Sequence, residues 1–167
     1  MKRGFTLIEL LISIAIFSLL STFVVANYNG NERTKKLKNQ TQLVVSGLEQ
    51  AQNKALAGAL ADGATPIAYK LTIMSCDNNC NYIITAVFAD SEKEEVLVDQ
   101  KSMSGVSITT SDNSGLEAEF SLPRGRMSLG EGISTFWVQL YNGDNYFCVN
   151  LTAVSGRIDI KNGRCQP

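Results

Sequence analysis

The sequence contains no histidine, which removes the base of serine and cysteine hydrolase triads and the commonest side-chain metal ligand. It has three prolines, the first of them Pro66, so no proline interrupts a helix in the part of the chain before that residue. It also lacks an excess of either charge, because 15 basic residues stand against 16 acidic ones. The charge balance gives no general reason to expect a polyanionic partner. We therefore expect no enzyme, no cofactor and no metal site.

The chain has four cysteines, Cys76, Cys80, Cys148 and Cys165, all of them well past the N-terminus. An even number favours disulfides in an exported domain, whereas in the cytosol the same number favours metal ligands or free thiols. The compartment therefore decides how the cysteines are interpreted, and the N-terminal segment decides the compartment.

The N-terminal segment is a long apolar run. Between Phe5 and Ala26 there are 22 residues, of which 14 are Leu, Ile, Val or Phe and only Glu9 is ionisable. At a rise of about 1.5 Å per residue, a helix of this length crosses a bilayer core of about 30 Å. The apolar side chains favour insertion by about 4 to 8 kcal/mol, which exceeds the cost of about 3 kcal/mol for a central acid. Lys2 and Arg3 place the N-terminus in the cytoplasm.

An ordinary cleaved signal peptide fits this segment poorly, because its apolar stretch is usually about 7 to 15 residues long and ends at a small-residue cleavage site. A plain membrane anchor fits the length but leaves Glu9 unexplained. Residues 2–11, KRGFTLIELL, instead resemble the class III signal of type IV pilins and type II secretion pseudopilins. The resemblance implies cleavage by a prepilin peptidase between Gly4 and Phe5, N-methylation of Phe5, and an assembly role for Glu9 as the fifth mature residue.

The charge of Glu9 has a physical explanation in such a family. Cleavage creates an α-amino group at Phe5, and subunits that stack as a filament bury their apolar segments against one another. A buried ammonium is costly without a partner, and a carboxylate of a neighbouring subunit supplies one. We expect Glu9 to set the register between subunits or to contact an inner-membrane assembly platform.

After Gly30 the pattern becomes amphipathic and predicts that the helix continues to about Leu60, until the segment DGATP ends it. One side of this second half carries residues spaced three and four apart, namely Leu37, Thr41, Val44, Leu48, Ala51 and Ala55. From Ile67 onward the spacing changes to two, in segments near 67–73, 82–88, 96–98, 106–108, 116–122, 134–141, 146–151 and 156–160. Asn142-Gly143 is typical of a hairpin turn.

These patterns predict an α+β protein in which a long N-terminal helix, transmembrane in its first half, packs on an antiparallel β domain, as in the type IV pilin fold. The expected parts are a leader at 1–4, a transmembrane and polymerisation helix at 5–30, an amphipathic second half at 31–61 and a periplasmic or extracellular β domain at 62–167. The C-terminal part, with Phe120, Gly125 and the closing Gly156-Arg157, is similar to the GspH/FimT branch of pseudopilins.

Four cysteines allow three pairings. We favour Cys76–Cys80, which closes the turn CDNNC, and Cys148–Cys165, which ties the C-terminal tail to a strand. A site with four thiolates is the rival, but the spacing C-x3-C followed by a distant Cys is not that of a zinc ribbon.

The resemblance implies a minor pilin or pseudopilin that primes or caps a filament. Its partners are other pilins or pseudopilins, the prepilin peptidase and the assembly platform. It crosses the inner membrane once before assembly, with the β domain in the periplasm, and then joins a periplasmic or extracellular filament. The alternative is a minor pilin with a tip that binds a surface or nucleic acid, for which Arg157, Lys161 and Arg164 are the candidate residues because some members of this branch bind DNA through C-terminal arginines.

Overall fold

The computed structural model describes residues 6–89, 95–130 and 132–166, with the backbone alone at 23–31. It contains one long helix, α1 (Leu7–Ala57), followed by nine strands. The chain divides into two compact units, 1–36 and 37–167, so that α1 contributes its first part to one unit and its second part to the other.

The second part of α1 packs against the β-strands through one stripe. All six residues that the sequence places on this stripe are buried, and Leu37, Val44, Leu48, Ala51 and Ala55 are fully so. The close approach occurs at Gly47, where an added Cβ would lie 2.8 Å from the ring of Tyr82. The α+β architecture, with a helix packed on antiparallel sheets as in pilins, is thus confirmed.

The helix ends at Ala57, about three residues earlier than the sequence pattern predicts. Gly58 adopts a left-handed φ of 60°, and its N–H donates to the carbonyl of Ala55 while the N–H of Ala59 donates to the carbonyl of Lys54. These two bonds form a Schellman motif, in which a glycine just past the last turn caps the free carbonyls. The glycine, rather than the later DGATP segment, ends the helix.

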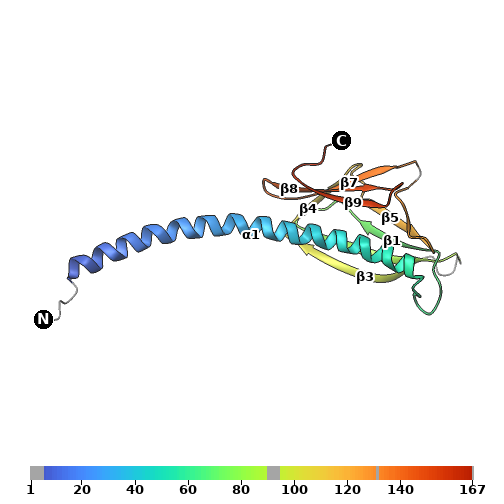
Figure 1. Ribbon diagram of the computed structural model, residues 1–167, viewed down its shortest axis with the longest axis horizontal. Helices are drawn as coiled ribbons and strands as arrows, with labels where there is room; N and C mark the ends of the chain where they lie inside the picture. The colour runs from blue at the N-terminus through green and yellow to red at the C-terminus, as the bar shows by residue number, and fades with distance from the viewer. Residues whose placement is uncertain (1–5, 90–94, 131, 167) are drawn as a thin grey trace. The chain divides into compact units, whose positions relative to one another are not determined.

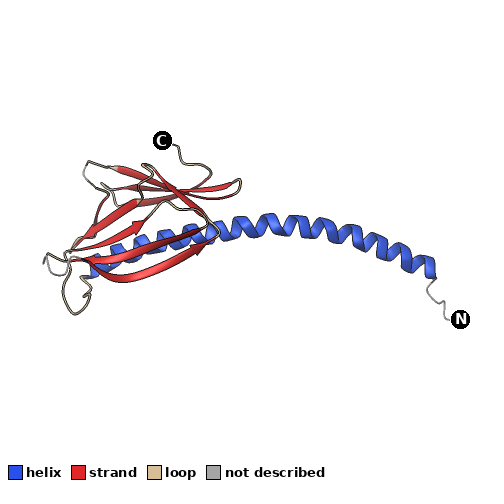
Figure 2. Ribbon diagram, turned by 180° about the vertical axis from the view of Figure 1, so that it is seen from behind, coloured by secondary structure: helices blue, strands red, loops and turns tan. Residues whose placement is uncertain are grey.

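The strands form two antiparallel sheets. One has the order β3-β2-β1-β5-β6 and the other β4-β7-β8-β9. In chain order the strands are β1 (Ala68–Ile73), β2 (Asn79–Val87), β3 (Glu95–Ser104), β4 (Ser107–Thr110), β5 (Leu116–Ser121), β6 (Arg126–Ser128), β7 (Thr135–Asn142), β8 (Asn145–Thr152) and β9 (Arg157–Asn162). Figures 1 and 2 show from opposite sides that the second part of α1 lies along one face of the five-stranded sheet and leaves its other face open.

The alternation of buried and exposed residues confirms most of the predicted strands. Val138, Leu140, Val149 and Leu151 all point into the core from the β7–β8 hairpin, whose two-residue turn follows Asn142. Two details differ: the expected short strand near 96–98 is the ten-residue β3, and the three-residue β6 has no counterpart in the sequence pattern. β3 is an edge strand with few buried residues, so hydrophobic alternation is weak along most of it.

Candidate functional site

The first turn of α1 is held by a reciprocal pair of side chains. The Thr6 hydroxyl accepts the N–H of Glu9 at 3.4 Å, and the Glu9 carboxylate accepts the N–H of Thr6 at 3.4 Å and its hydroxyl at 3.2 Å. Thr6 is the N-cap and Glu9 the third helical residue, which is the spacing of a capping box. Glu9 therefore caps its own helix and also places a negative charge at the positive end of the helix dipole.

This local role of Glu9 was missed in the sequence analysis, which explained the acid only through a partner subunit. The signal was present, because Thr-Leu-Ile-Glu matches the S/T-x-x-E pattern of a helix start. The expected cleavage between Gly4 and Phe5 and the methylation of Phe5 lie outside the described residues.

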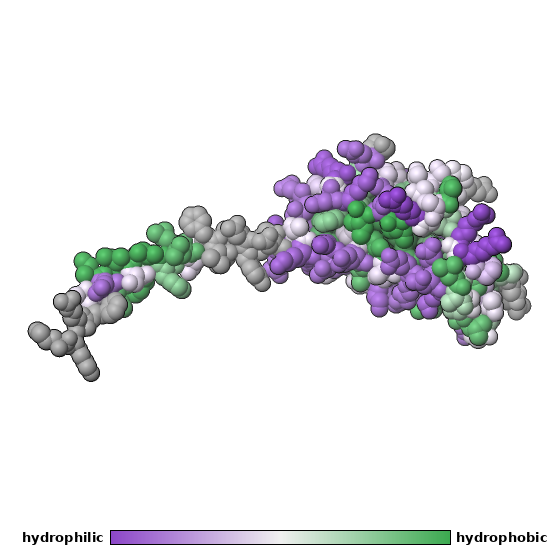
Figure 3. Space-filling model, viewed as in Figure 1, coloured by the Kyte–Doolittle hydropathy of each residue, from purple (hydrophilic) through white to green (hydrophobic). Residues whose placement is uncertain are grey.

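The surface of α1 after this first turn is almost entirely apolar. The large hydrophobic side chains from Leu7 to Leu20 are between 53% and 81% exposed. In Figure 3 they form a continuous apolar surface along this segment. The hydroxyls of Ser13, Ser18, Ser21 and Thr22 all donate to the carbonyl four residues earlier in the same helix.

These four hydroxyl donors are thus satisfied inside the helix and need no water. Since an unpaired polar group in an apolar environment costs several kcal/mol, this arrangement suits burial in lipid or among other apolar helices. Among the residues that the structure describes, no helix is long and apolar enough to cross a membrane, so the span at 5–30 stays a prediction.

The structure pairs the cysteines as Cys76–Cys80 and Cys148–Cys165, which are the pairings that the sequence analysis favours. The first closes the turn between β1 and β2. The second ties the C-terminal tail to β8, and Cys148 is almost fully buried beneath that tail. Because all four sulfurs are in disulfides, they do not form the rival thiolate metal site.

The three candidate DNA-binding cations have different surroundings. Arg157 forms an ion pair with Asp159, with its Nε 2.8 Å from a carboxylate oxygen. Arg164 lies over the ring of Tyr146, 4.5 Å from its centroid, and donates to its hydroxyl at 3.0 Å. Lys161 is exposed on β9 opposite Cys148. The guanidinium groups of Arg157 and Arg164 therefore already have partners within the chain, namely Asp159 and Tyr146.

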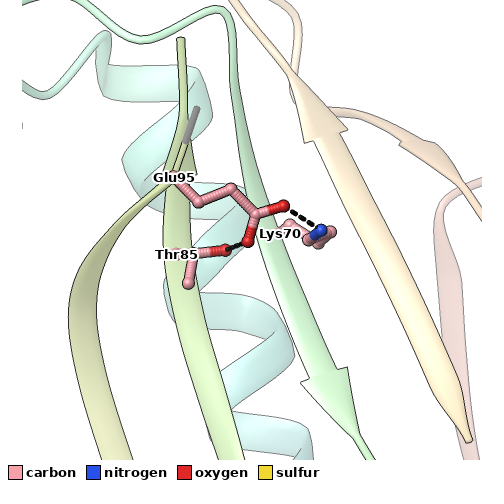
Figure 4. Close-up of polar contacts among 3 residues, drawn as sticks. All are labelled: Lys70, Thr85 and Glu95. Atoms are coloured by element: carbon pink, nitrogen blue, oxygen red, sulfur yellow. Dashed lines mark hydrogen bonds and ion pairs between the residues drawn. The ribbon is translucent and has the colours of Figure 1, made fainter. Parts of the chain in front are cut away.

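A polar cluster that the sequence analysis did not identify lies on the open face of the five-stranded sheet. Glu95 of β3 accepts hydrogen bonds from Lys70 of β1 and from Thr85 of β2, as Figure 4 shows. Partial burial by itself lowers the pKa of Lys70, but the hydrogen bond to Glu95 and the charges of Glu95, Glu117 and Glu119 outweigh it and raise the pKa. Only strand pairing brings these residues together, so no local sequence signal predicts the cluster.

Comparison with known families shows one match. Residues 1–25 match the family described as the prokaryotic N-terminal methylation motif. The motif is typical of type IV pilins and pseudopilins, and it implies processing by a prepilin peptidase, a membrane-anchored precursor and filament assembly. The match does not extend to the C-terminal residues that are similar to the GspH/FimT branch. Comparisons with curated proteins and with solved structures found no match.

Proposed function

We propose that this chain is a minor pilin or pseudopilin of the GspH/FimT type, which enters a filament through α1 and primes or caps it. The observation that carries the proposal is the first part of α1, whose apolar side chains are exposed while its hydroxyls are bonded internally. Such a surface is suited first to a bilayer and then to the apolar helices of other subunits. The methylation motif at residues 1–25 supports the same conclusion.

In this proposal the chain spans the inner membrane once, with residues 37–167 in the periplasm. The prepilin peptidase removes residues 1–4 and methylates Phe5, and the assembly platform then moves the subunit into a periplasmic or extracellular filament. Cleavage leaves an ammonium group two residues before α1 begins, next to the positive end of the helix dipole. The Glu9 carboxylate, in the first turn, offsets both positive charges and offers a counter-ion to the ammonium of a neighbouring subunit.

The capping box allows the charge of Glu9 to be separated from its capping role. Glu9→Gln keeps a side chain that serves in a capping box but removes the negative charge. We expect this variant to be cleaved normally and to be depleted from sheared filaments by about tenfold or more, which corresponds to about 1.4 kcal/mol per subunit contact. Filament incorporation is measured by immunoblot of the sheared fraction against the membrane fraction.

Thr6→Val is the matched variant, because it removes the capping hydroxyl at a cost of about 1 kcal/mol in helix stability but keeps the Glu9 charge. We expect it to retain most of its incorporation. If Glu9→Gln assembles normally while Thr6→Val does not, capping rather than charge is the function of Glu9, and the register role is wrong. Intact mass of the native protein tests the processing step, which requires loss of residues 1–4 and gain of one methyl group.

The alternative, a tip that binds nucleic acid, has one favourable feature, the stacked pair of Tyr141 and Tyr146 beside Arg164. Aromatic rings and arginine at a surface suit stacking on single-stranded bases. A salt-sensitive gel shift of single-stranded DNA that disappears in the double variant Lys161→Ala, Arg164→Ala would support this alternative. If Arg157→Ala alone abolishes DNA binding, the DNA contacts residues other than the tyrosine pair and Arg164.

A further inference from the structure

A cleft of about 340 Å³ lies at one end of the β7–β8 hairpin. Strand pairing places Thr135 opposite Thr152 and Trp137 opposite Asn150, with Phe136 and Leu151 between them. The remaining walls come from Ser111, just after β4, and from Gln166 in the C-terminal tail. Besides Phe136 and Leu151, the lining residues of the cleft are Ser111, Thr135, Trp137, Asn150, Thr152 and Gln166.

The wall that Gln166 provides belongs to the C-terminal tail, which is fastened across the outer face of the four-stranded sheet. Cys165 is bonded to Cys148, and its N–H donates to the side-chain carbonyl of Gln139 at 3.1 Å. Gln139 and Cys148 are partners in the β7–β8 register, on the same side of the sheet as Trp137. The disulfide therefore holds the tail beside the cleft.

The lining of the cleft is amphipathic but carries no charge. None of its lining residues is Asp, Glu, Lys or Arg. The charges beside it are Arg157 and Asp159, which lie opposite Thr152 and Asn150 in the β8–β9 register and neutralise each other in an ion pair. Two carboxamides and three hydroxyls provide both donors and acceptors, and the half-buried indole of Trp137 provides an apolar surface. The volume is at the lower end of the range of about 300 to 1,000 Å³ for small-molecule sites.

Several of these polar groups have hydrogen-bonding capacity to spare. Within the part of the chain that the structure describes, neither the indole N–H of Trp137 nor the carboxamide N–H groups of Asn150 donate to another protein group. The hydroxyls of Thr135 and Thr152 are likewise without a protein partner there. A ligand with several hydroxyls can satisfy these groups without displacing an existing contact.

We propose that this cleft binds one or two rings of a neutral sugar. A pyranose ring has an apolar face of C–H groups, which packs on an indole, and a rim of hydroxyls, which pair with carboxamides and threonine hydroxyls in both directions. The absence of charge in the lining selects neutral rings over sialylated or sulfated ones. The site lies wholly within the unit 37–167 and does not depend on the assembly role of α1.

The test uses the emission of Trp137, which is the single tryptophan of the chain. The full-length mature protein is held in a zwitterionic detergent, because sugar-headed detergents would compete, and is titrated with lactose, cellobiose and chitobiose. We expect at least one of them to give a saturable emission change with a Kd of about 1 mM, which corresponds to about −4 kcal/mol of binding free energy. Sialyllactose should bind less tightly than lactose.

Variants are compared by ligand-observed NMR, which does not depend on the tryptophan. Asn150→Ala and the nearly isosteric Thr152→Val should each weaken binding by about three- to tenfold through the loss of one hydrogen-bonding group. Asn81→Ala, an exposed asparagine on the other sheet, is the control and should bind like the parent. Reduction of Cys148–Cys165 should also weaken binding, because it releases the tail that carries Gln166.

Three results would overturn the proposal. The first is no saturable emission change with any of the three disaccharides up to about 50 mM. The others are sugar binding by both Asn150→Ala and Thr152→Val that is as tight as that of the parent protein, or loss of sugar binding in the control variant Asn81→Ala. Normal filament incorporation alongside any of these results would leave the proposed function standing and remove only the sugar site.

Discussion

Gly47 is a residue at which α1 lies close to the five-stranded sheet, and Gly47→Ala tests that contact. In an ordinary helix interior this change stabilises a protein by about 0.5 to 1 kcal/mol, because alanine loses less backbone entropy on folding than glycine. Here the added Cβ would lie 2.8 Å from two ring carbons of Tyr82 and 3.1 Å from a methyl of Leu71. Both neighbours are buried, so neither side chain can move aside into solvent.

Overpacking of this kind costs about 1 to 3 kcal/mol, which exceeds the gain in helix propensity. We therefore expect Gly47→Ala to lower the free energy of unfolding by about 1 to 2 kcal/mol. The measurement is urea unfolding of the full-length protein in detergent, followed by the emission of Trp137. That residue lies on β7, away from the substitution.

Two further variants make the reasoning refutable. In a Tyr82→Leu background the ring is gone, so Gly47→Ala should become neutral or stabilising. Ser46→Ala, on the exposed side of the same turn, should stabilise by about 0.5 kcal/mol from propensity alone. If Gly47→Ala stabilises the parent protein as Ser46→Ala does, the close approach of helix and sheet is not a constraint, and the packing argument is wrong.

Three other changes have expected outcomes in the same assay. Replacing Cys148 and Cys165 by serine should lower the free energy of unfolding by about 3 kcal/mol, the value for a loop of roughly this length. Lys70→Met should lower the free energy of unfolding by about 1 kcal/mol or less at neutral pH. Because the pKa of Lys70 is raised in the folded protein, the stabilisation by its charge is fully present below pH 10.5 and disappears as the pH rises through the pKa of the folded state. Gly58→Ala should cost about 1 kcal/mol through backbone strain alone, since no atom lies within 4 Å of the added Cβ.

Each of these changes has its own control. Reduction of the parent protein should reproduce most of the loss from the cysteine pair. For Lys70, an equal difference between parent and variant at neutral and at strongly alkaline pH would contradict the electrostatic explanation. Gly58→Asn should cost less than Gly58→Ala, because asparagine tolerates the left-handed conformation better than alanine.

Local periodicity was sufficient to predict most of the fold. The stripe from Leu37 to Ala55 is buried at every position that the spacing identified, and the β7–β8 hairpin forms where Asn142-Gly143 indicates. Such signals are visible in a sequence because each depends on residues a few positions apart. The two local signals that were missed, the capping box of Thr6 and Glu9 and the glycine cap at Gly58, are of the same kind and could have been found.

The sequence by itself determined the apolar N-terminal run, the acid at its start, the helical stripe and the alternating strands, because these follow from chemical character repeated along the chain. Only the tertiary structure decided that the strands form two sheets, that Gly47 must be glycine because Tyr82 lies against it, and that Trp137 shares a cleft with Gln166. Those relations join residues far apart in the sequence. They depend on which strands pair and where the tail is fastened, and neither is encoded in any short segment.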